Sequence, residues 1–129
     1  MSPRVVLVRD GLEGAAPWMT QVLREAGMNV RSISGPELAE AAPSDVLLLH
    51  LPERDAVAAC WALHRQGHRS LIAVSGSPSS KECIQLLNAG ADYYLDAWLP
   101  AAELVARVRV VLRFTAWLDE RTAIAGAAS

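Results

Sequence analysis

The sequence predicts a single α/β domain built on a parallel five-stranded sheet with helices on both faces. Short apolar runs without helical period, such as residues 46–49, are typical of strands that are buried on both faces. These runs alternate with amphipathic segments of helical period, which is the pattern of a parallel sheet with right-handed crossovers. The 129 residues suffice for one domain, and their 52% hydrophobic content fits strands that are covered twice.

The first half of the chain supplies three predicted strands. Residues 5–8 form an apolar run, and apolar residues then recur at helical spacing through residues 15–26, where a glycine follows. Residues 29–34 alternate in part between apolar and polar, as in a strand near a sheet edge. A short helix over residues 34–42, with proline at an early position, leads into the strand at residues 46–49.

The second half supplies two more strands and three helices. A helix with a broad apolar face is predicted over residues 52–66, and residues 71–74 form the next apolar run. A serine and a glutamate at capping-box spacing open a helix over residues 79–88. A short final strand follows at residues 92–96, and a proline begins the last helix, which is predicted over residues 100–120.

The last helix is longer than the sheet requires. Residues 100–120 would span ~30 Å at 1.5 Å per residue, roughly twice what a five-stranded sheet needs. Either the helix merely covers the sheet, or its C-terminal half is a dimer helix or a signalling linker. We expect a domain over residues 1–118 and a tail, or the start of a linker, over residues 119–129. A narrow seam continues past the expected end of the fold and comprises Leu104, Val108, Val111, Thr115 and Leu118.

The composition argues against several partners and compartments. The net charge of −2 and the lack of a basic tail give no attraction to nucleic acid or anionic lipid. No apolar run approaches the ~20 residues of a membrane span, and the first ten residues lack the layout of a secretory signal. Cys60 and Cys83 lie in predicted helices outside any metal-ligand pattern, so we expect reduced thiols in a cytoplasmic protein.

Five segments together resemble the receiver domain of bacterial response regulators, from residue 4 to residue 113. The strongest is Asn88-Ala-Gly-Ala-Asp-Tyr-Tyr-Leu, which is similar to the family's Ala-Gly-Ala-Asp-Asp-Tyr-Leu signature. The others are Arg4-Val-Val-Leu-Val, Ser44-Asp-Val-Leu-Leu-Leu, Glu103-Leu-Val-Ala-Arg-Val and a Leu-Arg pair late in the last helix. The resemblance implies two-component signal transduction and a flavodoxin-like (βα)5 doubly wound fold, with strand order 2-1-3-4-5 and an extended last helix.

The chemistry of that family uses an acidic pair to hold Mg²⁺, an aspartate that accepts phosphate, a hydroxyl, a switch aromatic and a lysine. Carried over by position, the acidic pair falls on Arg9 and Asp10, and the acceptor falls on His50. The hydroxyl falls on Ser75, the switch aromatic on Tyr94 and the lysine on Ala97. Only the second acidic residue, the hydroxyl and the aromatic keep the residue type of the family.

These departures predict a degenerate receiver that works without phosphorylation. A single carboxylate beside Arg9 would hold Mg²⁺ weakly or not at all, because the cation needs several oxygen ligands. His50 offers no carboxylate to phosphorylate, and Ala97 has no charge with which to sense a phosphate. We expect a non-enzymatic regulatory domain without a cofactor. The alternatives are a receiver-like domain that is switched by a small-molecule ligand and a domain that is phosphorylated on a replacement acceptor.

His50 is open to four roles, which are phosphoacceptor, metal ligand, pH switch and structural residue. We favour a structural hydrogen-bonded pair with Asp10, in which Arg9 and His50 supply the charges that Mg²⁺ and phosphate would bring. A metal site would need more ligands than these, and the sequence offers only Asp55 nearby.

Three further residues lie close to this predicted site. Ser75 and Tyr94 either remain a coupled switch that a ligand or partner biases, or they cap a turn and pack. Trp98 stands where the family has a proline after its lysine. We expect its ring to fill the space of the missing lysine, which would close the site.

In many response regulators the helix before the fifth strand, that strand and the last helix form a symmetric dimer. The candidate residues for such a face here are Lys81, Asp92, Asp96, Glu103, Arg107, Arg113 and Leu118. Mixed charges can pair across a two-fold axis, whereas a solvated helix face is the alternative because exposed ion pairs contribute little. We expect a homodimer that signals by protein contacts and works with an output domain, which binds DNA in most of the family. Nothing in this chain itself reads DNA, and no membrane contact is expected.

Overall fold

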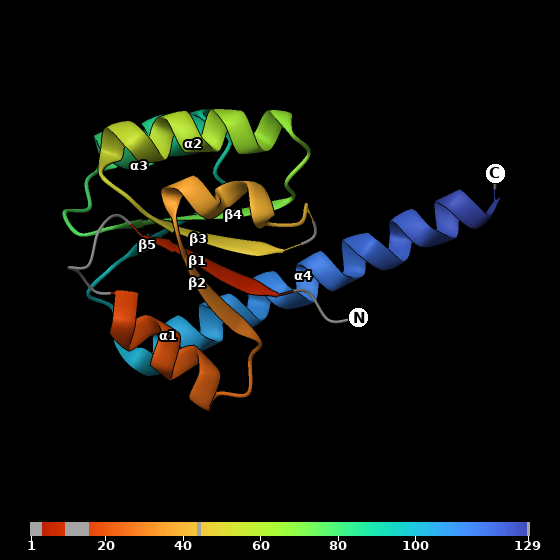
Figure 1. Cartoon of the computed structure of the whole chain (residues 1–129), viewed down its shortest axis with the longest axis horizontal. Helices are drawn as coiled ribbons and strands as arrows, with labels where there is room; N and C mark the ends of the chain where they lie inside the picture. Colours follow the sequence, from red (N-terminus) through yellow and green to blue (C-terminus); the bar gives the residue numbers. More distant parts are fainter. Residues whose placement is uncertain (1–3, 10–15, 44, 129) are drawn as a thin grey trace.

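The computed structural model describes residues 4–9, 16–43 and 45–128 of the chain. Within these ranges the strands form one parallel sheet in the order β2-β1-β3-β4-β5 (Figure 1). The predicted fold class and the strand order 2-1-3-4-5 are therefore confirmed. The strands are β1 (Val5–Arg9), β2 (Val30–Ser34), β3 (Val46–His50), β4 (Ser70–Ser75) and β5 (Tyr93–Asp96).

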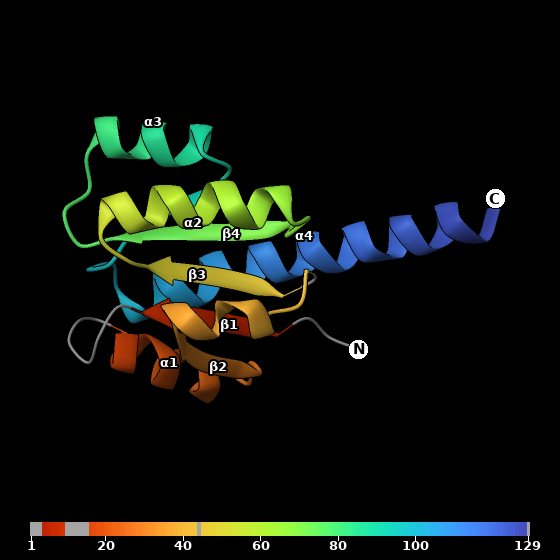
Figure 2. The same cartoon turned by 45° about the horizontal axis from the view of Figure 1, so that its top comes forward.

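Helices cover both faces of this sheet. In Figures 1 and 2, α1 and α4 lie on one face, and α2, α3 and the short helix η1 lie on the other. Each of these helices except α4 connects two parallel strands along the chain, as the alternating sequence pattern predicts. The bounds are α1 (Ala16–Glu25), η1 (Gly35–Glu40), α2 (Glu53–Arg65), α3 (Ser80–Asn88) and α4 (Ala101–Ala128).

The central strands are buried on both faces, which explains the apolar runs without helical period. In β1, Val5 and Leu7 pack into the core beneath α1 and α4. Val6 and Val8 alternate with them and pack into the core beneath α2 and α3. All four side chains have at most 1% of their surface exposed, so the sheet separates two hydrophobic cores.

The Ala-Gly-Ala stretch after α3 has a steric explanation. Gly90 adopts a φ of +118°, a conformation that side chains disfavour. A Cβ atom at this position would lie 2.8 Å from Cβ of His64 near the end of α2. Glycine therefore lets the chain leave α3 close to α2 and enter β5.

The short helix after β2 differs from its prediction. Gly35–Glu40 is a 3₁₀ helix of six residues, whereas a helix reaching residue 42 was expected. The Ser34 Oγ donates to Glu37 Oε1 at 2.9 Å, and this polar bond closes the first turn. None of the six residues is buried, so no core packing extends the segment into an α-helix.

The last helix, α4, runs to Ala128 and not to residue 120 as predicted. Its 28 residues span ~42 Å at 1.5 Å per residue, and its C-terminal half extends away from the body of the domain (Figures 1 and 2). No helix in the described ranges has both the length and the apolarity of a membrane span.

The predicted seam of α4 contacts its own domain. Leu104, Val108, Val111 and Thr115 each have at most 2% of their surface exposed. Only Leu118, at the end of the seam, is half-buried. The first four residues of the seam are therefore core residues of this domain and are not available to a second copy.

Candidate functional site

The sequence-predicted site residues gather where the parallel strands end. In the sheet register Arg9 pairs with His50, and Ser75 pairs with Asp96. Ala97 follows directly, and its N–H donates to the Ser75 carbonyl oxygen at 2.8 Å. Four of the predicted positions thus lie along one edge of the sheet, the edge where α/β proteins commonly bind ligands. Asp10, and with it the predicted pair with His50, lies outside the described residues.

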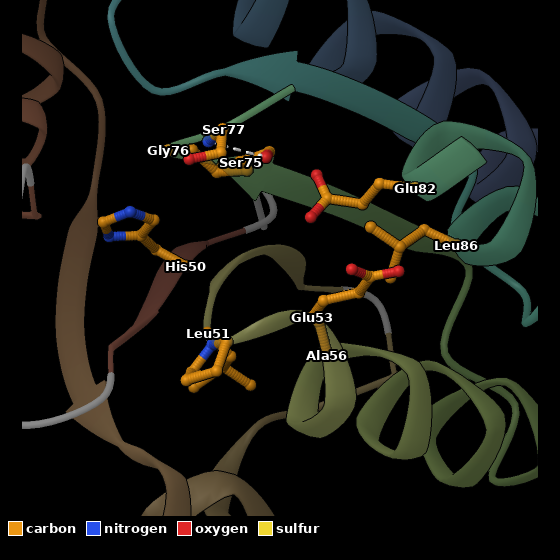
Figure 3. A pocket seen from close by; sticks show the side chains of 11 residues that line it. His50, Leu51, Glu53, Ala56, Ser75, Gly76, Ser77, Glu82 and Leu86 are labelled. Carbon is orange, nitrogen blue, oxygen red and sulfur yellow. Dashed lines mark hydrogen bonds between the residues drawn. The ribbon is translucent and has the colours of Figure 1, made fainter. Parts of the chain in front are cut away.

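A pocket of about 370 Å³ opens at this edge, between the loops that follow β3 and β4 (Figure 3). Its size falls within the usual range of small-molecule sites. Its polar groups come from the end of β3, from the loop after β4 and from the first turns of α2 and α3, and apolar side chains form the wall between them. The lining residues are His50, Leu51, Pro52, Glu53, Ala56, Val74, Ser75, Gly76, Ser77, Glu82 and Leu86.

His50 forms one side of this pocket. Its side chain is half-buried, and burial lowers the pKa of the imidazole below its ordinary value. A neutral ring is therefore the main form at neutral pH, with one nitrogen as a donor and the other as an acceptor. His50 consequently brings hydrogen-bonding capacity but little positive charge.

Two carboxylates reach the pocket from the first turns of two helices. Figure 3 shows Glu53 of α2 and Glu82 of α3 directed into the space across from His50. None of the eleven lining residues in the described part of the chain is a lysine or an arginine. Sequence reasoning noticed Glu82 only as a capping residue and missed Glu53. The available signal was that each carboxylate closely follows a strand that ends at this edge.

Ser75 is buried at the head of the loop after β4. Its Oγ accepts a hydrogen bond from Ser77 N–H at 3.1 Å. Two residues further, Ser79 Oγ accepts from Glu82 N–H at 3.1 Å and caps α3. The hydroxyls thus shape the loop that carries Glu82, which agrees with the turn-capping hypothesis for Ser75.

Tyr94 on β5 is tied to the start of α3. Its hydroxyl donates to Glu82 Oε1 and accepts from Ser79 N–H at 3.2 Å. Burial, followed by the hydrogen bond to Glu82, raises the pKa of Tyr94, while the Ser75 hydroxyl acts in the opposite sense. Tyr94 therefore remains neutral at physiological pH, and its hydroxyl shares the Glu82 carboxylate with the pocket.

Trp98 does not fill the space of the missing lysine, so that prediction is wrong. Its side chain is 71% exposed, and its Nε1–H donates to the Gly76 carbonyl oxygen at 3.0 Å. The backbone N–H of Trp98 donates to Asp96 Oδ1 at 2.8 Å, which turns the chain outward. Ala97, which precedes it, is fully buried. The ring braces the loop after β4 from outside and leaves the pocket open.

No group of three or more potential metal ligands occurs among the described residues. Asp55, the further ligand considered from the sequence, lines a different pocket together with Arg9. The Arg9 Nε–H donates to Ser32 Oγ on β2 at 3.2 Å. Arg9 thus lies toward the β2 side of the sheet edge, on the far side of β1 from β3.

The charged residues of the predicted dimer face have partners within the described part of the chain at three places. Asp92 Oδ2 accepts from Leu71 N–H at 2.8 Å, and burial raises the pKa of the Asp92 carboxyl. Glu103 and Arg107 form an ion pair one turn apart on α4, with Oε2 and Nε separated by 3.6 Å. Asp96 Oδ1 accepts from Trp98 N–H at 2.8 Å, and Lys81 and Arg113 complete the set of charged residues on this exposed face.

A second apolar row on α4 was missed by sequence reasoning. Val110, Phe114 and Trp117 are all exposed, at spacings of four and three residues. The Phe114 and Trp117 rings stack with centroids 5.8 Å apart, and the Arg121 guanidinium lies 5.2 Å from the Trp117 ring centroid. The signal was present as two aromatic residues that fall outside the buried seam.

Comparison with known sequences finds transcriptional regulatory proteins. PrrA of Mycobacterium tuberculosis is 34% identical over 119 residues, a match that covers 87% of this chain and 51% of the relative. CseB of Streptomyces coelicolor is 37% identical over 83 residues, or 63% of this chain and 36% of that protein. The chain thus spans about half the length of the first relatives it matches. No protein-family model matches it.

Comparison with solved structures finds the same architecture. An atypical orphan response regulator superposes with a TM-score of 0.70 and 20% identity, covering 86% of this chain and 96% of the other. The beryllofluoride-activated NtrC4 receiver domain gives a TM-score of 0.72 at 18% identity, over 87% and 98% of the two chains. With the strand order and the sequence relatives, these likenesses identify the fold of this chain as the receiver fold of response regulators.

Proposed function

We propose that this chain is a regulatory receiver domain that signals by protein contacts and without phosphorylation. The observation that carries the proposal is His50, an imidazole at the end of β3 where the family resemblance puts the acceptor aspartate. The chain would act as the regulatory part of a cytoplasmic transcriptional regulator, in which another part contacts DNA. Its transcriptional regulatory relatives support that role.

The charges around His50 also oppose phosphoryl transfer. Such transfer needs cations that neutralise the charge developing on the phosphoryl oxygens. The described lining of the pocket instead offers the carboxylates of Glu53 and Glu82, which repel a phosphoryl donor. The buried Ala97 side chain has no charge. In addition, the solved atypical orphan regulator with this fold is reported to use a phosphorylation-independent regulatory mechanism.

The test is a search for a phosphoryl adduct. The purified chain is incubated with Mg²⁺ and acetyl phosphate and analysed by intact mass spectrometry, with a receiver domain that retains its acceptor aspartate as the positive control. We expect an adduct on the control and none on this chain. Beryllium fluoride should likewise leave the NMR signals of His50 and Ser75 unchanged. An adduct that maps to His50 or Ser75 would overturn the proposal.

We propose further that the domain signals by forming a homodimer through the surface of α3, β5 and α4. β5 is the edge strand of the sheet, so the two helices and this strand form one continuous surface. The surface carries exposed Ile84 on α3 and the row Val110, Phe114 and Trp117 on α4. Exposed apolar groups of this extent favour association, and a second copy presents the same row for a two-fold contact. One structural neighbour is itself a receiver domain dimer.

Light scattering on matched tryptophan variants tests the dimer. Trp117 on α4 and Trp61 on α2 are 48% and 53% exposed, so replacing either with serine removes a similar apolar surface. We expect the unmodified chain and Trp61→Ser to be dimers, and Trp117→Ser to shift to monomer. A monomeric unmodified chain at high micromolar concentration, or equal behaviour of both variants, contradicts this interface.

A further inference from the structure

The pocket beside His50 combines a polar side with an apolar wall. Leu51, Ala56 and Leu86 supply the wall, and Glu53 and Glu82 supply the acidic side (Figure 3). Pockets of about 370 Å³ with a few convergent polar groups are the usual sites for small molecules. The chemistry of the lining therefore indicates which class of small molecule fits.

The balance of charge over the described lining of the pocket is negative. Helices α2 and α3 both begin beside the pocket, because Glu53 and Glu82 of their first turns line it, and at ~+0.5 charge each their N-termini contribute about one positive charge together. The two glutamates contribute two negative charges, and His50 is mainly neutral. About one negative charge remains, in a concave site where the surrounding protein strengthens electrostatic attraction. A cation fits this site better than a phosphate or a carboxylate.

An organic cation fits better than a metal ion. Mg²⁺ and Ca²⁺ take six or more oxygen ligands, and no group of three metal-ligating side chains occurs among the described residues, so water would have to supply most of the coordination. An ammonium or amidinium group makes charge-assisted hydrogen bonds to one or two carboxylates. Its carbon skeleton can pack on Leu51 and Leu86, which a bare metal ion would leave exposed.

Glu82 connects the pocket with β5. One of its oxygens accepts the hydroxyl hydrogen bond of Tyr94, and the same carboxylate lines the pocket. Tyr94 also lines a groove of about 150 Å³ beside Val110 of α4. A cation that binds Glu82 from the pocket side draws on the same carboxylate charge, and this weakens the hydrogen bond from the Tyr94 hydroxyl. A weaker hydrogen bond makes another rotamer of Tyr94, beside the proposed dimer surface, more accessible.

We propose that the pocket binds a small organic amine or amidine through Glu53 and Glu82, and that Tyr94 reports its occupancy to the α3, β5 and α4 surface. The regulatory part of this inference rests on the proposed function, because it assumes that this surface carries the output. The binding itself does not. Because the cation and Tyr94 share one carboxylate, their coupling is negative, and each weakens the interaction of the other with Glu82.

The probe is benzylamine, with benzoate and benzyl alcohol as anionic and neutral compounds of the same shape. Titrations of the isotope-labelled chain are followed by NMR. We expect saturable shifts of the amide signals of Glu53, Ser77 and Glu82 with benzylamine, and binding at least about tenfold weaker for the other two compounds. Glu53→Gln should weaken benzylamine binding about tenfold, whereas Glu103→Gln on α4, which is not among the lining residues, should leave it unchanged.

Tyr94 supplies the decisive variant. Removing its hydroxyl in Tyr94→Phe removes the competitor for Glu82, so benzylamine should bind several-fold more tightly, and the matched Tyr93→Phe should not differ from the unmodified chain. A purely structural role of Tyr94 predicts equal or weaker binding. The proposal is overturned if benzylamine gives no saturable shifts, if benzoate binds equally well, or if Tyr94→Phe does not bind more tightly. A phosphoryl adduct in the acetyl phosphate test would instead remove the proposed function alone.

Discussion

The two edges of the sheet handle their polar groups differently. At the edge where the strands begin, Arg4 pairs with Asp45 at 2.9 Å, and Asp45 Oδ2 also accepts from Ala42 N–H at 2.9 Å. Asp92 likewise accepts the N–H of Leu71 on the neighbouring strand. At the edge where the strands end, Glu53 and Glu82 face an open pocket, and only one of the Glu82 oxygens is shared with a partner in the described part of the chain, the Tyr94 hydroxyl. Polar groups with partners in the chain fix the fold, whereas polar groups that face a pocket remain able to bind another molecule.

The largest expected effect concerns Asp45, which is buried and has two hydrogen-bond partners. Asp45→Ala should lower the free energy of unfolding by ~2 kcal/mol, because it removes two charge-assisted bonds. Glu40→Ala, which removes the exposed ion pair with Arg31, should change it by less than ~0.5 kcal/mol. Urea denaturation measures both values. Equal losses would mean that burial does not distinguish these two ion pairs.

A second prediction concerns the buried hydroxyl pair of Ser70 and Thr115, which joins the start of β4 to α4. Thr115→Val keeps the shape and leaves the Ser70 hydroxyl without this partner, which should cost ~1–2 kcal/mol. The double variant with Ser70→Ala should recover part of the loss, because no unpaired hydroxyl remains. If the double variant shows the sum of the two single losses, the pair is not coupled.

The next prediction concerns how stability depends on pH, and it compares His50, at the edge where the strands end, with His68, at the edge where they begin. Burial lowers the pKa of both His50 and His68 below the ordinary value of about 6.5, so the folded state binds protons less well than the unfolded state. Their contribution to stability is therefore complete above about pH 6.5 and is lost as the pH falls below it. Asp45 partly offsets the lowered pKa of His68. His50→Gln should accordingly flatten the stability curve between about pH 6.5 and 5 more than His68→Gln does, as measured by thermal unfolding.

The smallest expected effect is at the pocket itself. Glu53→Gln relieves repulsion between the two carboxylates and removes a favourable charge from the first turn of α2. These opposing effects should leave the free energy of unfolding within ~0.5 kcal/mol of the unmodified value. A loss as large as that of Asp45→Ala would show that Glu53 supports the fold, and the contrast between the two edges would fail.

The fold could be predicted almost completely from the sequence. Strands buried on both faces leave an unmistakable apolar run, and the glycines after α1 and α2 do adopt positive φ values. The end of α4 could not be predicted, because the expected boundary rested on an apolar seam that stops at Leu118. Helix formation beyond that point needs no seam, and so leaves no periodic signal.

The sequence predicted where the site lies, but not the acidic charge of its lining or the orientation of Trp98. Family resemblance and strand ends together indicated His50, Ser75 and Tyr94, and the structure brings these to one region. The acidic lining was missed because Glu53 and Glu82 are distant in sequence and meet only once α2 and α3 are placed. The orientation of Trp98 depends on one hydrogen bond to Gly76, which no sequence pattern encodes.

The unbroken α4 also sets a rotational phase. A helix turns by ~100° per residue, so any segment that continues it emerges at an angle fixed by the number of residues in between. Inserting one residue after Arg121 would rotate such a segment by ~100°, whereas inserting seven would leave it within ~20° of its original angle. The number of residues in this helix would thus determine the direction in which any segment joined to it faces relative to the domain.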